Sequence, residues 1–175
     1  AGAAVVAGRA LLSTNGSFSG FLTIAPSGTF TLAGTGTKIF DTLRLFNQGK
    51  VLWLAGDIQS QPNASVSFVT NAGLWRIEGN DTLNFPFGGP QPVFVNAPSG
   101  ILRKLTGTGT TAVQNWQFRN DGTVDVQSGT LSFSGGGGVL SGAWSVAATS
   151  QILFSNGSYT SAGNATFTGP GLSRF

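Results

Sequence analysis

The acid–base chemistry open to this chain rests mainly on carboxylates, because its 175 residues include six Asp and Glu but no His and no Cys. Without His or Cys, the chain cannot form a Ser–His or Cys–His nucleophile or a cysteine-based zinc site. The six carboxylates are dispersed along the sequence at Asp41, Asp57, Glu78, Asp81, Asp121 and Asp125.

The placement of these acids favours turns over a catalytic cluster. Asp121 and Asp125 are an even number of residues apart, which would put both on one side of a continuous strand. However, Asp121 directly precedes Gly122, and Asp is an ordinary residue of turns. Glu78 and Asp81 flank the Gly79-Asn80 pair in the same way. We therefore predict that the acids are solvated turn residues and that the protein is not an enzyme, with no cofactor and no metal site.

Tryptophan is the other residue type whose chemistry could define a site, since an outward indole can stack on a sugar ring. Leu74 and Trp75 point to opposite faces of their strand and either could be outward; an outward Trp beside Arg76, or beside Asn and Gln, would be a plausible glycan contact. The alternative is that the indoles fill the core, because alternation alone does not say which face points outward. The candidate glycan-binding residues are Trp53, Trp75, Arg76, Trp116 and Trp144.

Charge and hydropathy narrow the classes of partner. Lys and Arg number nine against six acids, for a formal net charge of +3, and the longest basic run is Arg103-Lys104. Nucleic-acid binding needs a basic patch or stripe, so we expect no nucleic-acid partner. No apolar run approaches the ~20 residues of a transmembrane helix, so we expect no membrane insertion of this segment.

Short segments of alternating apolar and polar residues run through the sequence. Residues 66–69, 74–77, 123–126 and 130–133 alternate with period two, and Gly, Asn, Asp or Pro flank them. This periodicity is typical of half-buried strands, and the flanking residues are turn formers. The 27 glycines indicate many turns. The fold class is therefore all-β.

A repeated element gives the arrangement of these strands. An Asn, a short spacer, a Gly and then a strand recur with the asparagines 24 or 25 residues apart, at Asn47, Asn71, Asn96 and Asn120. A step of this length is about one coil of a parallel β-solenoid, in which asparagines at equivalent turns stack into amide ladders. We predict a right-handed parallel β-solenoid (β-helix) of about seven coils. The alternative is a β-sandwich or jelly roll with Asn-Gly hairpin turns.

The last third of the chain has a pattern of its own. The run from Asn120 to Gly137, then Gly142 to Ala148 and Gly163 to Gly169, resembles repeats of very long bacterial surface proteins. These include autotransporter-like passenger regions and giant adhesin-like exoproteins built of β-solenoid repeats. The resemblance is looser over residues 25–119, and it implies an architecture but no catalytic residues.

Together these observations predict one β-solenoid domain over residues 1–175, which could be an excerpt of a longer repeat protein. The Pro-rich segment 85–92 is expected to form a protruding loop, because Pro cannot donate to a β-ladder. We expect a structural or adhesive module of a secreted or cell-surface bacterial protein, assembling end to end into oligomers or filaments. Its partners would be neighbouring repeats, further copies, glycans or other surface proteins. A carbohydrate-binding or carbohydrate-active β-helix domain is the alternative.

Overall fold

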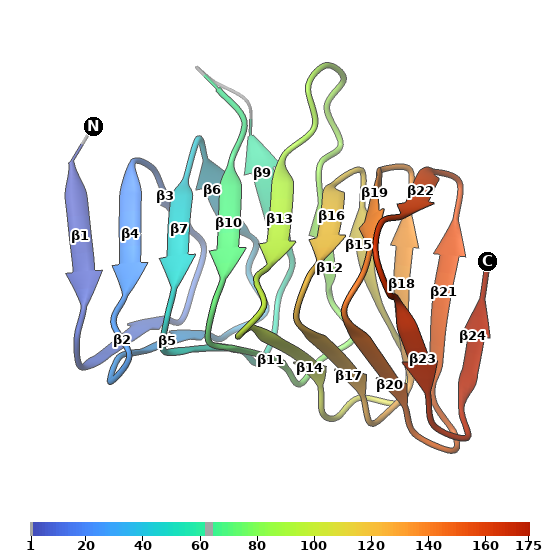
Figure 1. Ribbon diagram of the computed structural model, residues 1–175. Helices are drawn as coiled ribbons and strands as arrows, with labels where there is room; N and C mark the ends of the chain where they lie inside the picture. The colour runs from blue at the N-terminus through green and yellow to red at the C-terminus, as the bar shows by residue number, and fades with distance from the viewer. Residues whose placement is uncertain (1, 62–64) are drawn as a thin grey trace.

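The computed structural model describes residues 2–61 and 65–175, and this part of the chain contains strands and turns but no helix. The strands form three sheets of eight, and every pairing among them is parallel. Figure 1 shows the chain passing down the front sheet, across the base and up the back before it advances, which is a right-handed coil. The parallel β-solenoid is confirmed, and the β-sandwich alternative, which needs antiparallel hairpins, is wrong.

Each coil contributes one strand to each sheet, in the order sheet A, sheet B, sheet C. Sheet A contains β1 (Ala3–Val6), β4 (Phe21–Ile24), β7 (Arg44–Asn47), β10 (Phe68–Asn71), β13 (Val93–Asn96), β16 (Gln117–Asn120), β19 (Gly137–Leu140) and β22 (Ser158–Ser161). Sheet B contains β2 (Arg9–Leu12), β5 (Thr29–Leu32), β8 (Lys50–Trp53), β11 (Leu74–Ile77), β14 (Ile101–Lys104), β17 (Thr123–Val126), β20 (Ala143–Val146) and β23 (Thr166–Thr168). Sheet C contains β3 (Gly16–Phe18), β6 (Lys38–Asp41), β9 (Ile58–Gln61), β12 (Thr82–Asn84), β15 (Thr110–Gln114), β18 (Thr130–Ser134), β21 (Gln151–Ser155) and β24 (Leu172–Arg174).

The number of coils is eight, one more than the sequence step predicts. The central coils have the predicted length, since Phe68 pairs with Val93, 25 residues later. The outer coils are shorter: Ala3 pairs with Phe21, and Gln117 pairs with Gly137. A step measured on the central asparagines therefore overestimates the mean length of a coil.

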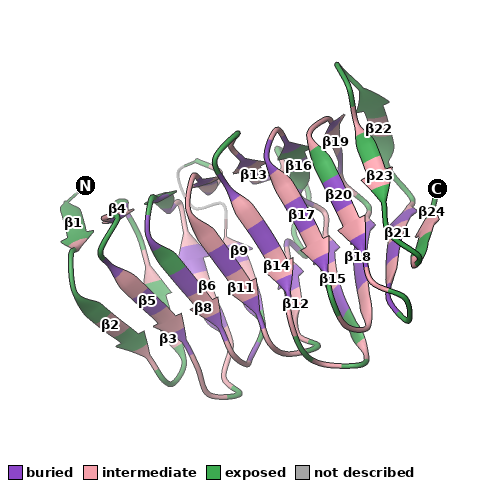
Figure 2. Cartoon of the chain, turned by 60° about the horizontal axis from the view of Figure 1, so that its bottom comes forward, coloured by how far each residue is buried: buried purple, intermediate pink, exposed green. Residues whose placement is uncertain are grey.

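The core is a set of rows that run along the axis of the rod. In most strands the second and fourth residues point inward and are buried, while the first and third are intermediate or exposed. Because the pairing is in register, each inward side chain stacks on its equivalent in the next coil, as Phe94 does on Phe118 with ring centroids 5.5 Å apart. Figure 2 shows these buried rows as purple bands that stop at both terminal coils, where exposed residues predominate.

The predicted asparagine ladder is present at the turns from sheet A to sheet B. The four asparagines are register partners in β7, β10, β13 and β16, and all are 0 % exposed. Three side-chain hydrogen bonds join them: each Nδ2 donates to the Oδ1 of the next, at 2.6, 2.8 and 2.7 Å along the series Asn47, Asn71, Asn96, Asn120. Stacked amides thus satisfy polar groups that a single coil would leave unpaired inside the protein.

The Pro-rich segment lies between β12 and β13. Phe85 at its start is 1 % exposed and belongs to the core, while Phe87 is 43 % exposed. In Figure 1 the chain here rises beyond the ends of the strands as a yellow-green loop. The projecting part therefore begins after Phe85.

Candidate functional site

The four tryptophans lie in the core, which corrects the expectation that they form an outward platform. Trp53, Trp75, Trp116 and Trp144 are 0–2 % exposed. The Nε1 of Trp53 donates to Gly56 O at 2.7 Å, and that of Trp144 donates to Ser141 O at 2.9 Å. An indole enclosed on both faces cannot stack on a sugar, so these rings stabilise the fold instead.

Arg76, the fifth predicted binding residue, points to the opposite side of β11 from Trp75. Its guanidinium forms an ion pair with Glu78 on the outer surface of sheet B. The predicted pairing of an indole with a neighbouring guanidinium is therefore not formed, because alternation along a strand places adjacent side chains on opposite faces.

The carboxylates are held separately rather than in one site. Asp125 accepts from Arg103 Nε at 2.8 Å, and Asp121 accepts from Arg119 Nε at 2.6 Å. Asp57 accepts the backbone N–H of Thr82 at 2.7 Å. Within residues 2–61 and 65–175, no three Asp or Glu side chains converge on a position that could hold a metal ion. The absence of catalysis stays a prediction.

Two buried lysines are functional-group positions that the sequence analysis missed. Lys38 and Lys104 are both 0 % exposed and lie at the turns from sheet B to sheet C. Lys38 Nζ donates to the carbonyls of Gly34, Gly36 and Ala55 at 2.5, 2.8 and 2.6 Å. Each ammonium is surrounded by backbone oxygen of the turns, which makes it a cap for carbonyls that point into the rod.

Lys104 has a similar cage. Its Nζ donates to Gly79 O at 2.8 Å and to Thr111 Oγ1 at 3.1 Å, with Thr106 O and Asn80 Oδ1 at 3.3 Å. Desolvation by burial lowers the pKa of Lys104 from 10.5 to about 8, although the charge of Asp81 opposes the shift. Burial also lowers the pKa of Lys38, against Asp81 and Asp57. Both side chains have all of their donors directed at protein, so we assign them to structure rather than to ligand binding.

The outer face of sheet A carries the aromatic side chains that a surface site needs. Phe21 and Phe46 are 56 % and 40 % exposed. Phe21, Arg44 and Phe68 are register partners in one outward row, and the Arg44 guanidinium lies 5.6 Å from the centre of the Phe68 ring. Phe46 lies in the next outward row, between Thr23 and Thr70. We call Phe21, Arg44, Phe46 and Phe68 the sheet A patch.

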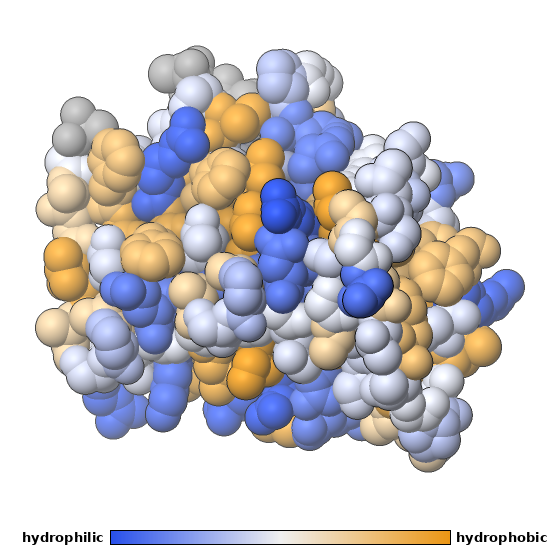
Figure 3. Space-filling model, in the orientation of Figure 1, coloured by the Kyte–Doolittle hydropathy of each residue, from blue (hydrophilic) through white to orange (hydrophobic). Residues whose placement is uncertain are grey.

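This patch is visible on the front of the molecule. Figure 3 shows orange apolar side chains over the N-terminal half of sheet A, interspersed with blue and white polar ones. The sequence contains one indication of this patch: Phe46 and Phe68 are each next to an apolar residue, Leu45 and Val69, that is buried, and adjacent residues of a strand point to opposite faces. Identifying the outward face, however, required the register.

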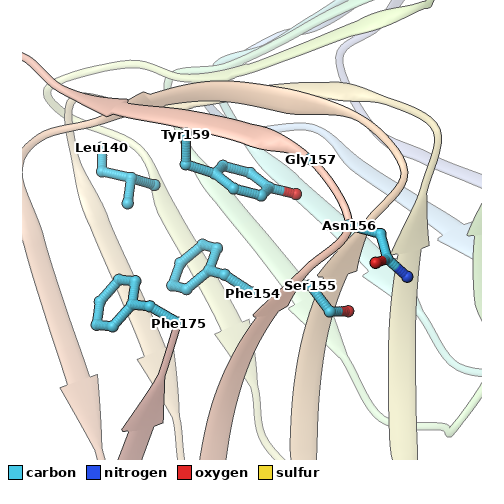
Figure 4. Close-up of a pocket in the computed structure, with 7 residues that line it drawn as sticks. All are labelled: Leu140, Phe154, Ser155, Asn156, Gly157, Tyr159 and Phe175. Carbon is cyan, nitrogen blue, oxygen red and sulfur yellow. The ribbon is translucent and has the colours of Figure 1, made fainter.

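The C-terminal end of the rod has a hollow of about 300 Å³ lined mainly by apolar side chains. Phe154 and Phe175 stack with centroids 5.2 Å apart and ring planes 8° from parallel, and Tyr159 crosses above Phe154. Figure 4 shows these three rings facing one another around the opening. The hollow is lined by Leu140, Phe154, Ser155, Asn156, Gly157, Tyr159 and Phe175.

Comparison with models of protein families, with curated proteins and with solved structures finds no match for this chain. The described residues form no helix that is long and apolar enough to span a membrane.

Proposed function

We propose that the chain is a structural and adhesive module of a secreted or cell-surface bacterial protein. Its outer faces contact other molecules while its stacked core keeps those faces flat and rigid. The observation that carries this proposal is the sheet A patch, where Phe21 and Phe46 remain exposed beside Arg44 on a regular sheet. Exposed apolar patches on soluble proteins mark interaction surfaces. The resemblance of residues 120–175 to repeats of bacterial surface proteins supports the location.

The rod geometry supports a structural role. Hydrogen bonds, ring stacks and the asparagine ladder all run along the axis, so that each coil is held by the coils on either side. A solenoid of this kind gains stability with each added coil, because its stability is approximately the sum of coil terms and of interface terms between neighbouring coils. Self-association and neighbouring repeats are the partners that we propose first.

A second candidate function, carbohydrate binding, is favoured by the mixed chemistry of the same patch. Phe21 and Phe68 alternate with Arg44 in one row, and Phe46 alternates with threonines in the next. A sugar ring has an apolar face and a hydroxyl rim, so it matches an alternation of rings and hydrogen-bonding groups better than a continuous apolar surface. The glycan site predicted at the tryptophans would then lie at phenylalanines on a different sheet.

The test is retention of the labelled chain on beads coated with protein, with polysaccharide or with neither. Phe21→Ser combined with Phe46→Ser removes two exposed rings, each worth about 1 kcal/mol in contact, and should lower retention by roughly tenfold or more. Leu11→Ser combined with Leu52→Ser on the outer face of sheet B is the matched control and should leave retention unchanged.

Retention on both coats supports an adhesive module, and retention on polysaccharide alone supports the carbohydrate-binding candidate. Equal retention by the patch variant and the original chain would contradict both. Incubation of the chain with a panel of soluble polysaccharides should release no reducing ends and no unsaturated products. Release that is abolished by an Asp→Asn change would show that the chain is an enzyme.

A further inference from the structure

Arg44, in the middle of the sheet A patch, is an exposed cation whose charge is not neutralised by a described carboxylate. The structure describes three ion pairs, each between an arginine and an acid: Arg76 with Glu78, Arg103 with Asp125 and Arg119 with Asp121. Arg44 belongs to none of them. Its guanidinium lies instead over the Phe68 ring, 5.6 Å from the ring centre. A cation–π contact of this kind leaves the positive charge and the N–H donors available to a ligand.

The outward face of sheet A around Arg44 carries no acid. Arg44 is the one charged residue in the four strands β4, β7, β10 and β13. The acid closest to it in sequence is Asp41, which is half-buried at the end of β6 in sheet C, and no described ion pair joins the two. Lys50, at the start of β8, is an exposed cation that follows the same coil into sheet B. With a formal net charge of +3 on the chain, this region favours an anionic ligand.

The backbone of this face is already paired within the protein. β7 pairs with β4 on one side and with β10 on the other. A peptide gains main-chain hydrogen bonds when it adds to the edge of a sheet, which the face of a sheet does not offer. Recognition at the sheet A patch therefore depends on side chains, which favours a ligand that binds through ring faces, hydroxyls and carboxylates.

The side chains of the patch are spaced for a chain of sugar rings. Phe21, Arg44 and Phe68 are register partners in successive strands, which lie ~4.8 Å apart. Successive rings of a linear polysaccharide are separated by a similar distance, so a glycan chain along the rod axis meets one side chain of this row with each sugar. Phe46, in the next outward row, lies between two threonines whose hydroxyls can bond to the hydroxyl rim of a sugar.

A carboxylate carried on the sugar ring is the anion that fits this arrangement. It is planar and accepts two parallel hydrogen bonds from a guanidinium. Because it is attached directly to the ring, its pairing with Arg44 holds the glycan chain beside the exposed rings of Phe21 and Phe46. Arg119, further along the same sheet, offers no such position, because Asp121 already accepts from its Nε at 2.6 Å.

We propose that the sheet A patch binds a polysaccharide of uronic acids, with a sugar carboxylate paired with Arg44 and the neighbouring sugar rings packed on Phe21 and Phe46. This inference rests on the proposed adhesive function, which it deepens by naming the class of ligand. The charge selects the acidic polymer, and the rings select sugar over other acidic chains.

The first experiment compares two forms of one polymer. Beads are coated with equal amounts of polygalacturonate or of the same polymer after methyl esterification, which removes the charge and leaves the sugar rings. Retention of the labelled chain should be about tenfold higher on polygalacturonate, because a hydrogen bond between charged groups contributes a factor of this order. Equal retention on the two coats would overturn the proposal.

Arg44→Gln removes the charge at the site. It should lower retention on polygalacturonate by about tenfold and retention on the methyl ester by less than about threefold. Arg119→Gln is the matched control: it is exposed and outward on the same sheet and changes the net charge by the same amount, yet its loss of retention should be less than about threefold. Circular dichroism should show that both variants fold as the original chain does. Equal losses for the two variants would mean that net charge alone decides retention and would overturn the site.

The double variant Phe21→Ser with Phe46→Ser separates the contribution of the rings from that of the charge. It should lower retention on polygalacturonate and on the methyl ester by a similar factor of about tenfold. Arg44→Gln should affect polygalacturonate alone. Unchanged retention of the double variant on polygalacturonate would contradict the packing of sugar rings on the patch.

Soluble polyglutamate tests the other class of acidic polymer, since it carries carboxylates without sugar rings. At equal carboxylate concentration it should displace the chain from polygalacturonate beads about tenfold less effectively than soluble polygalacturonate does. Equal displacement would show that an acidic polypeptide fits as well, and would overturn the assignment to a polysaccharide.

Failure of this inference is distinguishable from failure of the proposed function. A chain that binds protein-coated beads through the sheet A patch, with no preference for polygalacturonate over its ester, would overturn the uronate ligand and leave the adhesive function standing. Retention on polygalacturonate that Arg44→Gln abolishes, with none on protein coats, would support the ligand and contradict a general adhesive module. No retention on any coat would overturn both.

Discussion

Between sheet A and sheet B, four asparagines in consecutive coils pass hydrogen bonds to one another along the axis. Between sheet B and sheet C, the inward polar groups are backbone carbonyls, and two lysines three coils apart cap them. We call these regions the asparagine corner and the lysine corner. The polar side chains at both corners are 0 % exposed. The asparagine corner repeats the same side chain in consecutive coils, whereas the lysine corner uses an isolated long side chain at each of two coils.

The length of the turns accounts for much of this difference. Three of the four asparagines precede two-residue turns, such as 48–49 and 72–73, so successive amides fall one rung apart and in register. At the lysine corner the turns between described strands have three to five residues. Two of these turns have five residues. Turn 33–37 is followed directly by Lys38, the first residue of β6, and turn 105–109 directly follows Lys104, the last residue of β14. A longer turn leaves carbonyls inside the rod that no neighbouring coil repeats. A flexible side chain with three donors can reach them.

The largest effect is expected from interrupting the asparagine corner in its middle. Asn71→Leu removes a donor to Asn96 and an acceptor for Asn47, which leaves two buried polar groups short of a partner. At about 1–3 kcal/mol for each such group, the free energy of unfolding should fall by about 2–6 kcal/mol. Urea unfolding monitored by tryptophan fluorescence measures this change in the free energy of unfolding.

Asn120→Leu is the matched control, because Asn120 accepts from Asn96 but donates to the carbonyls of Ser141 and Ala143 instead of to another amide. Only one amide then loses a partner, and Ser141 O still accepts from the indole N–H of Trp144, so the cost should be about half that of Asn71→Leu. Combining Asn71→Leu with Asn96→Leu should cost less than the sum of the two single changes, since each removes the other's partner. Strict additivity would show that the amides do not act as a chain.

At the lysine corner, Lys104→Met should lower the free energy of unfolding by about 2–3 kcal/mol. It leaves the carbonyls of Gly79 and Thr106 without this donor, while the Met side chain fills the same volume. The loss stays local, because no second lysine bonds to Lys104. Lys38→Met combined with Lys104→Met should therefore be additive within about 0.5 kcal/mol, in contrast to the asparagine pair.

A smaller change is expected from pH. The pKa of Lys104 is lowered from 10.5 to about 8 in the folded protein by desolvation, so between these values the unfolded chain binds more protons than the folded one. The contribution of Lys104 to the free energy of unfolding should therefore rise as pH increases from about 8 to 10. Urea titrations at pH 7.5 and 9.5 should show a larger increase for the original chain than for Lys104→Met. An identical pH dependence of the two would contradict the burial of this charge.

The smallest effect is expected next to Lys104, at Arg103. The two residues are adjacent in β14, but Arg103 points outward and pairs with Asp125 at 2.8 Å, with about a third of its side chain exposed. Arg103→Met should change the free energy of unfolding by less than about 1 kcal/mol, as for other surface ion pairs. A larger loss than that of Lys104→Met would reverse our assignment of the inward and outward positions of this strand.

The asparagine corner could be predicted from the sequence and the lysine corner could not. Asparagines at a step of 24 or 25 residues identify equivalent turns, and the parallel solenoid follows from that repeat. Lys104 follows Arg103, so the pair reads as an exposed basic run. Lys104 is two residues after Leu102 and therefore lies on the same face of the strand as that apolar residue. This indicates an inward lysine only once the strand is known to extend from Ile101 to Lys104.

The direction of the tryptophan side chains was ambiguous in the sequence for a related reason. Trp75 and its neighbour Leu74 are both apolar, so period two gives two possible inward sets, and only the register with Val51 and Leu102 decides between them. A single strand therefore does not distinguish a core indole from a surface one. The phenylalanines of the sheet A patch are likewise identified by the register, which places Phe21, Arg44 and Phe68 in one outward row.

The in-register stacking of coils is the central claim, and disulfide formation between engineered cysteines tests it most directly because the chain has no cysteine of its own. Thr70 and Val95 are outward register partners in adjacent coils, while Thr70 and Arg119 are in the same row two coils apart. With strands ~4.8 Å apart, the first pair is within disulfide reach and the second, at roughly 10 Å, is not. Oxidation of Thr70→Cys with Val95→Cys should give an intramolecular disulfide in nearly all molecules, and Thr70→Cys with Arg119→Cys should give almost none. Equal yields for the two pairs, or a higher yield for the second, would contradict the parallel register on which the asparagine corner and the sheet A patch both depend.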